Sequence, residues 1–406
     1  MKSSEYTSTS RERESLNMRC QYHWKPAIFA LMIVTCVGFT DGAAQSGKAE
    51  PSYEYPTQAR LSRLNNQIYN SLTFAQARRG VPEIKLLSKK QEEIEYIGDK
   101  KELIDLNLWQ ESPSRIIFHN GKYHTWIMHL TFYREVGRLE KPKNYYLTSE
   151  DGYRWKVEAE LPPGEPGSFD DFWREGLQVV AFDGKFWMFY AANATDDVKY
   201  GNDKRNGYRR NGIGLLVADQ PEGPWKRSTD KPLFVRSEDP NAWDYDMTNN
   251  PYPVYFKGKW FIYYKSKNTQ KGITRTLQGV AVADSITGPY VKYENNPICD
   301  GHGSFVWAWR GGITMLPFGA NGKIHWSPDG LHWHNVDDPA SRKIKTPIFS
   351  AFYLPHDPLS GTPVTRDEPD EFWGLETRQS KNANPRDWSI VRGTVTFNPA
   401  VKGKRK

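Results

Sequence analysis

The feature that most constrains the fold is a short pattern that the sequence repeats. Three segments, 115–127, 178–190 and 253–264, each contain an apolar approach, a turn that ends in Gly-Lys and a strand rich in aromatic residues. A tight turn that ends in glycine, placed between two such runs, is typical of a β-hairpin. Each segment therefore predicts two antiparallel strands joined by a tight turn.

A second pattern follows the first and occurs four times. It has a strand, a turn with Asp and Gly, and an aromatic residue that begins the next strand; its copies are residues 146–155, 216–225, 280–290 and 324–333. Weaker copies of the first pattern begin near residues 305 and 372. Five units of roughly four strands each are typical of a five-bladed β-propeller. We therefore expect an all-β fold, a five-bladed β-propeller over residues 109–400, with a short N-terminal helical extension.

The composition agrees with this fold and excludes several other classes. The 406 residues include 15 Trp, 22 Tyr and 19 Phe, far too many for a disordered chain. The composition also excludes a coiled coil, a helical solenoid and a polytopic membrane protein. The formal net charge is +7 with acidic and basic residues interspersed, so we expect no nucleic-acid partner. The basic tail, residues 401–406, is expected to be a solvated end.

The N-terminus has the pattern of a secretory signal peptide over residues 1–44. An apolar run at 27–39 follows basic residues and precedes three small residues that end at Ala44. The run is shorter than the roughly 20 residues that span a bilayer. We predict cleavage after Ala44, a periplasmic or secreted bacterial protein, and no stable membrane insertion of the mature chain.

Two further expectations concern the start of the chain and its cysteines. Met18 is an alternative start, because the polar stretch before it is longer than a usual signal-peptide n-region. After cleavage only Cys299 remains, so no internal disulfide is expected. Export without disulfides fits a bacterial protein that is stable because of its size.

Residues 45–108 differ from the rest and predict a linker followed by a helical segment. Apolar residues recur at helical spacing between Ala59 and Ala75, and Gly80 can end that helix. A second short helix is expected around residues 89–97. This segment acts either as a cap on the main domain or as an arm for dimerisation.

The predicted propeller also indicates where the chemistry lies. The innermost strand of each blade faces a central channel, and the residues just before that strand gather at one end of it. Many of these residues are polar or aromatic, and they include Glu111, Asp171, Glu175, Asp244, Asp246, Asn250, His302 and Trp307.

Several motifs carry a resemblance to a known family. They include the run at 279–292, the residues Gly301 and His302, and the Asp-Tyr-Asp sequence that ends at Asp246. The chain resembles five-bladed glycoside hydrolases, most nearly family 117, the exo-acting α-1,3-(3,6-anhydro)-L-galactosidases, and more distantly family 43. The likeness covers about residues 105–400. It implies an oligosaccharide substrate and a homodimer formed through residues 57–108.

The departures from the family pattern concern its carboxylates. Ser112, Asn250 and Gly303 stand at three positions where the family pattern has acidic residues, and only His302, a proposed general acid in that family, is retained. Glycoside hydrolysis normally needs two carboxyl groups. Either neighbouring carboxylates have taken over, or the protein binds glycans without hydrolysing them. The replacement candidates are Glu111, Glu175, Asp244 and Asp246, followed by Asp170, Asp171 and Glu376.

The sequence thus predicts three catalytic residues, His302, Asp246 and Glu175. The residues expected to bind substrate are Glu111, Asp171, Asp244, Asn250 and Trp307. Simpler roles remain open: Asp244 and Asp246 as turn caps, Glu175 in an ion pair with Arg174, and the tryptophans as core residues. The sequence indicates no cofactor and no metal ligands, and it leaves a divalent cation in the channel open.

Overall fold

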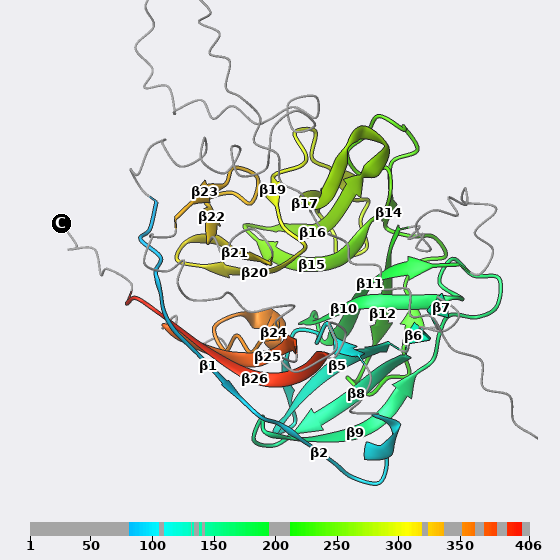
Figure 1. Ribbon diagram of the computed structural model, residues 1–406, viewed down its shortest axis with the longest axis vertical. Coiled ribbons are helices and arrows are strands. Elements are labelled where there is room, and N and C mark those ends of the chain that lie inside the picture. The colour runs from blue at the N-terminus through cyan, green and yellow to red at the C-terminus, as the bar shows by residue number, and fades with distance from the viewer. Residues whose placement is uncertain are drawn as a thin grey trace, which may run out of the picture. The chain divides into compact units, whose positions relative to one another are not determined.

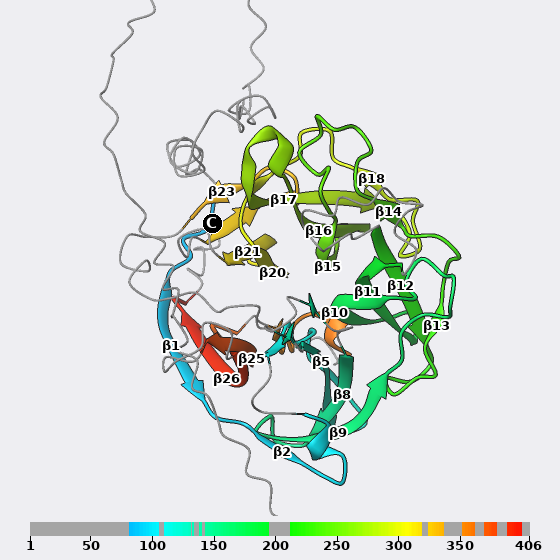
Figure 2. The ribbon, with the colours of Figure 1, turned by 45° about the vertical axis from the view of Figure 1, so that its right-hand side comes forward.

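The main strands of the chain form five sheets arranged around one axis (Figure 2). The computed structural model describes residues 81–104, 109–130, 132–133, 138–139, 143–194, 212–318, 324–336, 351–361, 369–379 and 388–399, all within one unit, Pro51–Lys406. The predicted signal peptide, the linker, the helix at 59–75 and the basic tail lie outside these residues. None of the described helices is both long and apolar enough to cross a membrane.

Blades one to three are the larger sheets. Blade one contains β3 (Trp109–Glu111), β4 (Ile117–His119), β5 (Lys122–Leu130), β8 (Lys143–Ser149), β9 (Arg154–Leu161) and β2 (Glu95–Ile97). Blade two contains β10 (Trp173–Phe182), β11 (Lys185–Asn193), β12 (Gly212–Ala218), β13 (Lys226–Arg227) and β14 (Phe234–Val235). Blade three contains β15 (Asn249–Phe256), β16 (Lys259–Asn268), β17 (Ile273–Ala283), β18 (Val291–Lys292) and β19 (Cys299–Asp300).

Blades four and five complete the ring. Blade four contains β20 (Gly303–Trp309), β21 (Gly312–Phe318), β22 (His325–Ser327) and β23 (His334–Asn335), and blade five contains β24 (Ala351–Phe352), β25 (Glu371–Gln379), β26 (Trp388–Phe397) and β1 (Leu86–Glu92). Outside the blades lie β6 (Phe132–Tyr133), β7 (Arg138–Leu139) and the 3-10 helices η2 (Lys101–Leu103), η4 (Thr269–Lys271) and η6 (Pro358–Ser360). The predicted all-β, five-bladed propeller is confirmed.

The tight turns that the repeats predict join the two inner strands of blades one, two and three. Both central residues of each turn have positive φ, at 48° and 77° for Asn120-Gly121 and at 53° and 69° for Asp183-Gly184. Lys257-Gly258 repeats this geometry at 49° and 79°. Two left-handed residues define the type I′ turn, whose twist matches that of the flanking strands. The repeats therefore encode both the strands and the way in which they pair.

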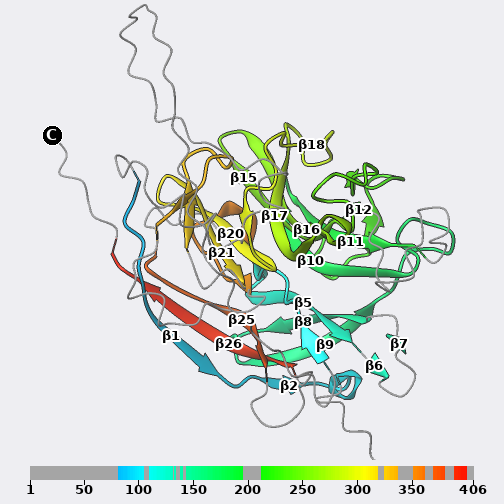
Figure 3. The ribbon, with the colours of Figure 1, turned by 45° about the horizontal axis from the view of Figure 1, so that its top comes forward.

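The helix predicted for residues 89–97 is wrong, because this segment contains strands. β1 pairs with β26, and Figures 1 and 3 show the two strands side by side. Lys89 and Gln91, two residues apart on one face, both reach the buried Glu376 of β25. β26 lies between β1 and β25, and its Gly393 leaves room for the Glu376 side chain to reach β1. A Cβ at Gly393 would lie only 3.0 Å from the Glu376 carboxyl carbon. Glu376, a sequence candidate for the site, thus holds the first strand in the last blade.

A buried ion pair joins the blades near the axis. Arg115 has no exposed surface, and its Nη1 lies 2.5 Å from Oδ2 of Asp357, which follows the inner strand of blade five. Its backbone N–H donates to Gln178 of blade two at 3.0 Å, and its Nη2 donates to the carbonyl of Pro253 in blade three at 3.2 Å. Burial alone would lower the pKa of Arg115, but Asp357 and Tyr252 together outweigh burial and raise it. Four blades therefore meet at one arginine, through its backbone N–H and its guanidinium.

We expect Asp357→Asn to lower the free energy of unfolding by about 3–5 kcal/mol, because it leaves a buried guanidinium without its counterion. The asparagine Oδ1 can still accept from the Leu359 N–H, as the Asp357 Oδ1 does at 3.0 Å, so the change keeps this hydrogen bond and removes the charged acceptor that faces Arg115. Urea denaturation measures the effect. Lys185→Ala, which breaks an exposed pair with Asp219, is the control and should move the midpoint little. An Asp357→Asn variant as stable as this control would contradict the expectation.

Candidate active site

The inner strands of blades one, two and three begin with the same backbone irregularity. Ser112, Gly176 and Asn250 all have left-handed φ, at 53°, 60° and 47°. In blades two and three the strand register shifts at this point, as it does at a β-bulge. Asparagine and glycine adopt this conformation readily. We call these three residues the bulge positions.

The residue before each bulge position is therefore structurally equivalent in the three blades. Glu111 pairs with Met128, Glu175 with Ala191 and Asn249 with Lys265, each on the next strand outward. Two of the three equivalent positions, in adjacent blades, are glutamates. Glu111 and Glu175, two of the replacement carboxylates expected from the sequence, thus share one backbone position, directly before Ser112 and Gly176.

Glu175 lies at the contact between blades two and three. Its side chain is 5% exposed, and its Oε1 accepts a hydrogen bond from Nδ2 of Asn249 at 3.3 Å. The backbones are close here, because a Cβ on Gly176 would lie 3.1 Å from Cα of Asn250. The ion pair considered between Glu175 and its neighbour Arg174 does not form, since Arg174 pairs with Asp170 at 2.8 Å.

Lys265 and His302 extend this cluster into blades three and four. Lys265, 5% exposed, lies opposite Asn249 in the strand ladder, and its Nζ is 3.1 Å from Nε2 of His302. His302 Nδ1 is 3.1 Å from Oγ1 of Thr276. An ammonium group offers only donors, so Nε2 accepts and the ring proton lies on Nδ1. In this arrangement the Nε2 atom of His302 has no proton to give.

Asp246 and Asp171 both cap turns. Oδ2 of Asp246 accepts from the N–H of Thr269 at 3.0 Å and from its Oγ1 at 2.9 Å, at the start of η4. Oδ2 of Asp171 accepts from the N–H of Gly167 at 2.8 Å. For Asp246, the turn-cap alternative weighed from the sequence describes these contacts better than the catalytic role.

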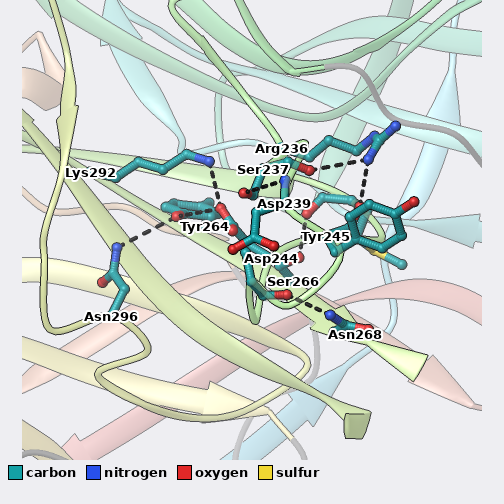
Figure 4. A network of polar contacts seen from close by, with 12 residues as sticks. Arg236, Ser237, Asp239, Asp244, Tyr245, Tyr264, Ser266, Asn268, Lys292 and Asn296 are labelled. Atoms are coloured by element: carbon teal, nitrogen blue, oxygen red, sulfur yellow. Dashed lines mark hydrogen bonds and ion pairs between the residues drawn. The ribbon is translucent and has the colours of Figure 1, made fainter. Parts of the chain in front are cut away.

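Asp244 belongs to a structural device that the chain uses twice. Figure 4 shows Asp244 between Lys292, which lies on β18, and Tyr264. The Oδ2 atom of Asp244 lies 2.5 Å from Nζ of Lys292 and 3.2 Å from the Tyr264 hydroxyl. In blade two, Asp170 accepts from the Tyr190 hydroxyl at 2.7 Å and pairs with Arg227 on β13 at 3.1 Å.

Both aspartates lie 20 residues before their tyrosines and five before the equivalent residues Glu175 and Asn249. Asp244 is also 3% exposed. A buried contact repeated in successive blades marks structure, so the substrate-binding role predicted for Asp244 is not supported.

The remaining predicted residues have different surroundings. Trp307 has no exposed surface and packs against Phe305 and Phe372, so it is a core residue without a face for a sugar, contrary to the prediction. Asn250 is half-buried, and its N–H donates to Oδ1 of Asn249 at 2.7 Å. For Glu111 only the backbone position is described.

Sequence reasoning assigned no role to Asn249 and missed Lys265 and Thr276. A signal for Lys265 was present, because it directly follows the aromatic run that ends at Tyr264 in a strand expected to be buried. A lysine in such a strand needs a polar environment. Within the described part of the chain, no group of three or more His, Cys, Asp or Glu side chains is arranged to hold a metal ion.

Comparisons with known proteins give a fold relationship. No protein-family model matches the sequence, and no curated protein matches it either. Zg3597, a family 117 glycoside hydrolase from the marine bacterium Zobellia galactanivorans, has a TM-score of 0.60 at 21% identity over 76% of this chain and 90% of its own. The catalytic domain of the GH62 α-L-arabinofuranosidase of Coprinopsis cinerea has a TM-score of 0.52 at 11% identity, over 79% of this chain and 99% of its own.

A third structure, that of BT0996 in an RGII complex, has a TM-score of 0.52 at 12% identity over 84% of this chain and 95% of its own. The resemblance to family 117 that the sequence motifs indicate is thus confirmed at the level of the fold. At these identities the likeness establishes the propeller, and the roles of individual residues have to come from this chain's own geometry.

The Asp170 cluster predicts a pH dependence of stability. Burial alone would raise the pKa of Asp170, but Arg174 and the Tyr190 hydroxyl outweigh burial and lower it. A carboxyl whose pKa is lower in the folded state stabilises the protein fully above its unfolded-state pKa, and loses that contribution as the pH falls toward the folded-state value. We expect Asp170→Asn to be less stable than wild type at pH 7, with a difference that shrinks below about pH 4. Urea midpoints from pH 7 to 3 test this, and a constant difference would contradict it.

Proposed function

We propose that this protein is an exported glycoside hydrolase that acts, from one chain end, on oligosaccharides derived from plant or algal polysaccharides. The observation that carries the proposal is the buried Glu175, held by Asn249 at the start of an inner strand, with Glu111 at the equivalent position of the adjacent blade. The fold, shared with Zg3597 and the GH62 arabinofuranosidase, supports it. Export rests on the signal-peptide pattern, and action from a chain end rests on the family resemblance.

The chemistry needs two carboxyl groups, one to protonate the leaving oxygen and one to activate water or to attack the sugar. Glu175 and Glu111 supply this pair in our proposal. Asn249 fixes the orientation of the Glu175 carboxyl through its Nδ2 hydrogen bond. We assign His302 to positioning Lys265, because its Nε2 accepts from Lys265 and its Nδ1 proton goes to Thr276.

A second candidate function is glycan binding without hydrolysis. The observation that favours it is the chemistry of the bulge positions, because Ser112, Gly176 and Asn250 offer a hydroxyl, no side chain and an amide. None of these can exchange a proton in the way a carboxyl group does. In this alternative the cluster around Glu175 recognises a sugar without cleaving it.

Hydrolysis of a panel of neutral and charged oligosaccharides by the full chain tests the proposal. We expect Glu175→Gln and Glu111→Gln each to lower kcat at least about 100-fold, because each removes a group that transfers protons or attacks. Asp246→Asn should stay near wild type if Asp246 only caps the turn at Thr269.

Two outcomes would redirect the assignment. Loss of turnover in Asp246→Asn together with an active Glu175→Gln would return the catalytic role to Asp246. Binding of a sugar in calorimetry, with no turnover on the whole panel, would establish the glycan-binding alternative.

A further inference from the structure

A hairpin beside the candidate site is strongly basic. Residues 265–275, which join the end of β16 through η4 to the start of β17, contain four basic residues and no acidic ones; the basic residues are Lys265, Lys267, Lys271 and Arg275. We call residues 265–276 the basic hairpin. Such a concentration of one charge raises the local concentration of oppositely charged ligands.

The base of the basic hairpin forms part of the site. Lys265 lies opposite Asn249, which holds Glu175, and both Lys265 and Thr276 contact the His302 ring at 3.1 Å. The N–H of Gly301 also donates to the carbonyl of Thr276 at 3.2 Å. The cations of the hairpin therefore begin at the cluster that we propose to be catalytic and continue outward from it.

The outer cations of the basic hairpin differ from two other lysines of blade three. Lys259 pairs with Asp284 at 2.7 Å, and Lys292 pairs with Asp244 at 2.5 Å. In the part of the chain that the structure describes, Lys267, Lys271 and Arg275 form no ion pair. A carboxylate that does face the hairpin, Asp246, is bound to Thr269. The charge of these three outer cations is therefore not balanced by ion pairs with the residues that the structure describes.

We propose that the site takes a saccharide that carries an anionic group, a sulfate ester or a uronate carboxylate, and that the basic hairpin recognises this group. Both groups present oxygens that lysine and arginine bind through charge-assisted hydrogen bonds. Lys265 is placed to contact the ring nearest the proposed catalytic carboxyls, and the outer cations contact the rings beyond it. This saccharide is the substrate of the proposed hydrolase, so its identity rests on the proposed function and on the same site.

Calorimetry on the full-length Glu175→Gln variant tests the inference independently of turnover, with neutral, sulfated and uronate oligosaccharides of matched length as probes. We expect an anionic ligand to bind at least about tenfold more tightly than its neutral counterpart, and the difference to shrink at high salt because charges attract less strongly there. Comparison of the sulfated with the uronate oligosaccharide then identifies the group, because the ligand with the recognised group binds more tightly.

Charge-removing variants locate the recognition. Lys271→Gln with Arg275→Gln should weaken the anionic ligand about fivefold and leave the neutral one unchanged, because both side chains are exposed and a modest effect is expected of each. Lys259→Gln, on the same strand as Lys265 but at its other end, is the matched control and should leave both affinities unchanged. Lys265→Gln should show the largest loss of affinity for the anionic ligand. Lys265 is buried, so if this variant does not fold, the variant at Lys271 and Arg275 decides the question.

The outcomes separate this inference from the proposed function. Equal binding of neutral and anionic ligands, with turnover of neutral substrates by the wild type, would overturn the inference and leave a glycoside hydrolase. Preferential binding of the anionic ligand without any turnover would support the inference and overturn the hydrolase. An effect of Lys259→Gln as large as that of the outer pair would overturn the role of the hairpin.

Discussion

The structure depends on the ion pair between Arg115 and Asp357. Inner strands converge in a propeller, so the side chains near the axis have no layer beyond them to pack against. Here a fully buried guanidinium binds Asp357 and the Pro253 carbonyl while the arginine backbone binds the Gln178 side chain, and so one residue links four blades. A buried charge is stable only when it is paired and hydrogen-bonded. The fold can therefore keep this charge only while those blades hold their positions.

The residues that meet at Arg115 also locate the candidate site along the inner strands. Arg115, Gln178 and Pro253 lie three to four residues further along their inner strands than the equivalent positions Glu111, Glu175 and Asn249. The polar cluster that we assign to chemistry therefore lies three to four residues before the buried ion pair, toward the start of the inner strands.

Comparison of the blades separates structural residues from candidate functional residues. Asp170 and Asp244 occupy equivalent positions, bind equivalent tyrosines and pair with equivalent basic residues, so their role is architectural. Glu175 and Asn249 also occupy equivalent positions but differ in chemistry. Equivalent backbone positions with different side chains allow each blade to contribute a different chemical group to one site.

The sequence predicted the propeller and its turns because both depend on local patterns that recur. It could not predict β1, because Lys89 and Gln91 are polar, and the side chain that they both bind, Glu376, is 285 residues beyond Gln91 in the sequence. The sequence analysis placed Trp307 in the site and overlooked Lys265. Whether either side chain reaches the site depends on which face of its strand packs against the neighbouring blade, and the sequence alone does not give this. The replacement carboxyls at Glu111 and Glu175 were named, but their equivalence appeared only with the left-handed residues that follow them.

The pairing of β1 with β26 has a consequence for how the chain folds. Gln91 and Glu376 are 285 residues apart, so blade five is made from both ends of the sequence. Contacts so distant in sequence form late, because the closure entropy of a long loop opposes them. Until the last strands have been synthesised, β1 has no partner, and its unpaired edge is open to other chains. Synthesis of the final strands is therefore the step after which the ring can close and the first strand is protected from aggregation.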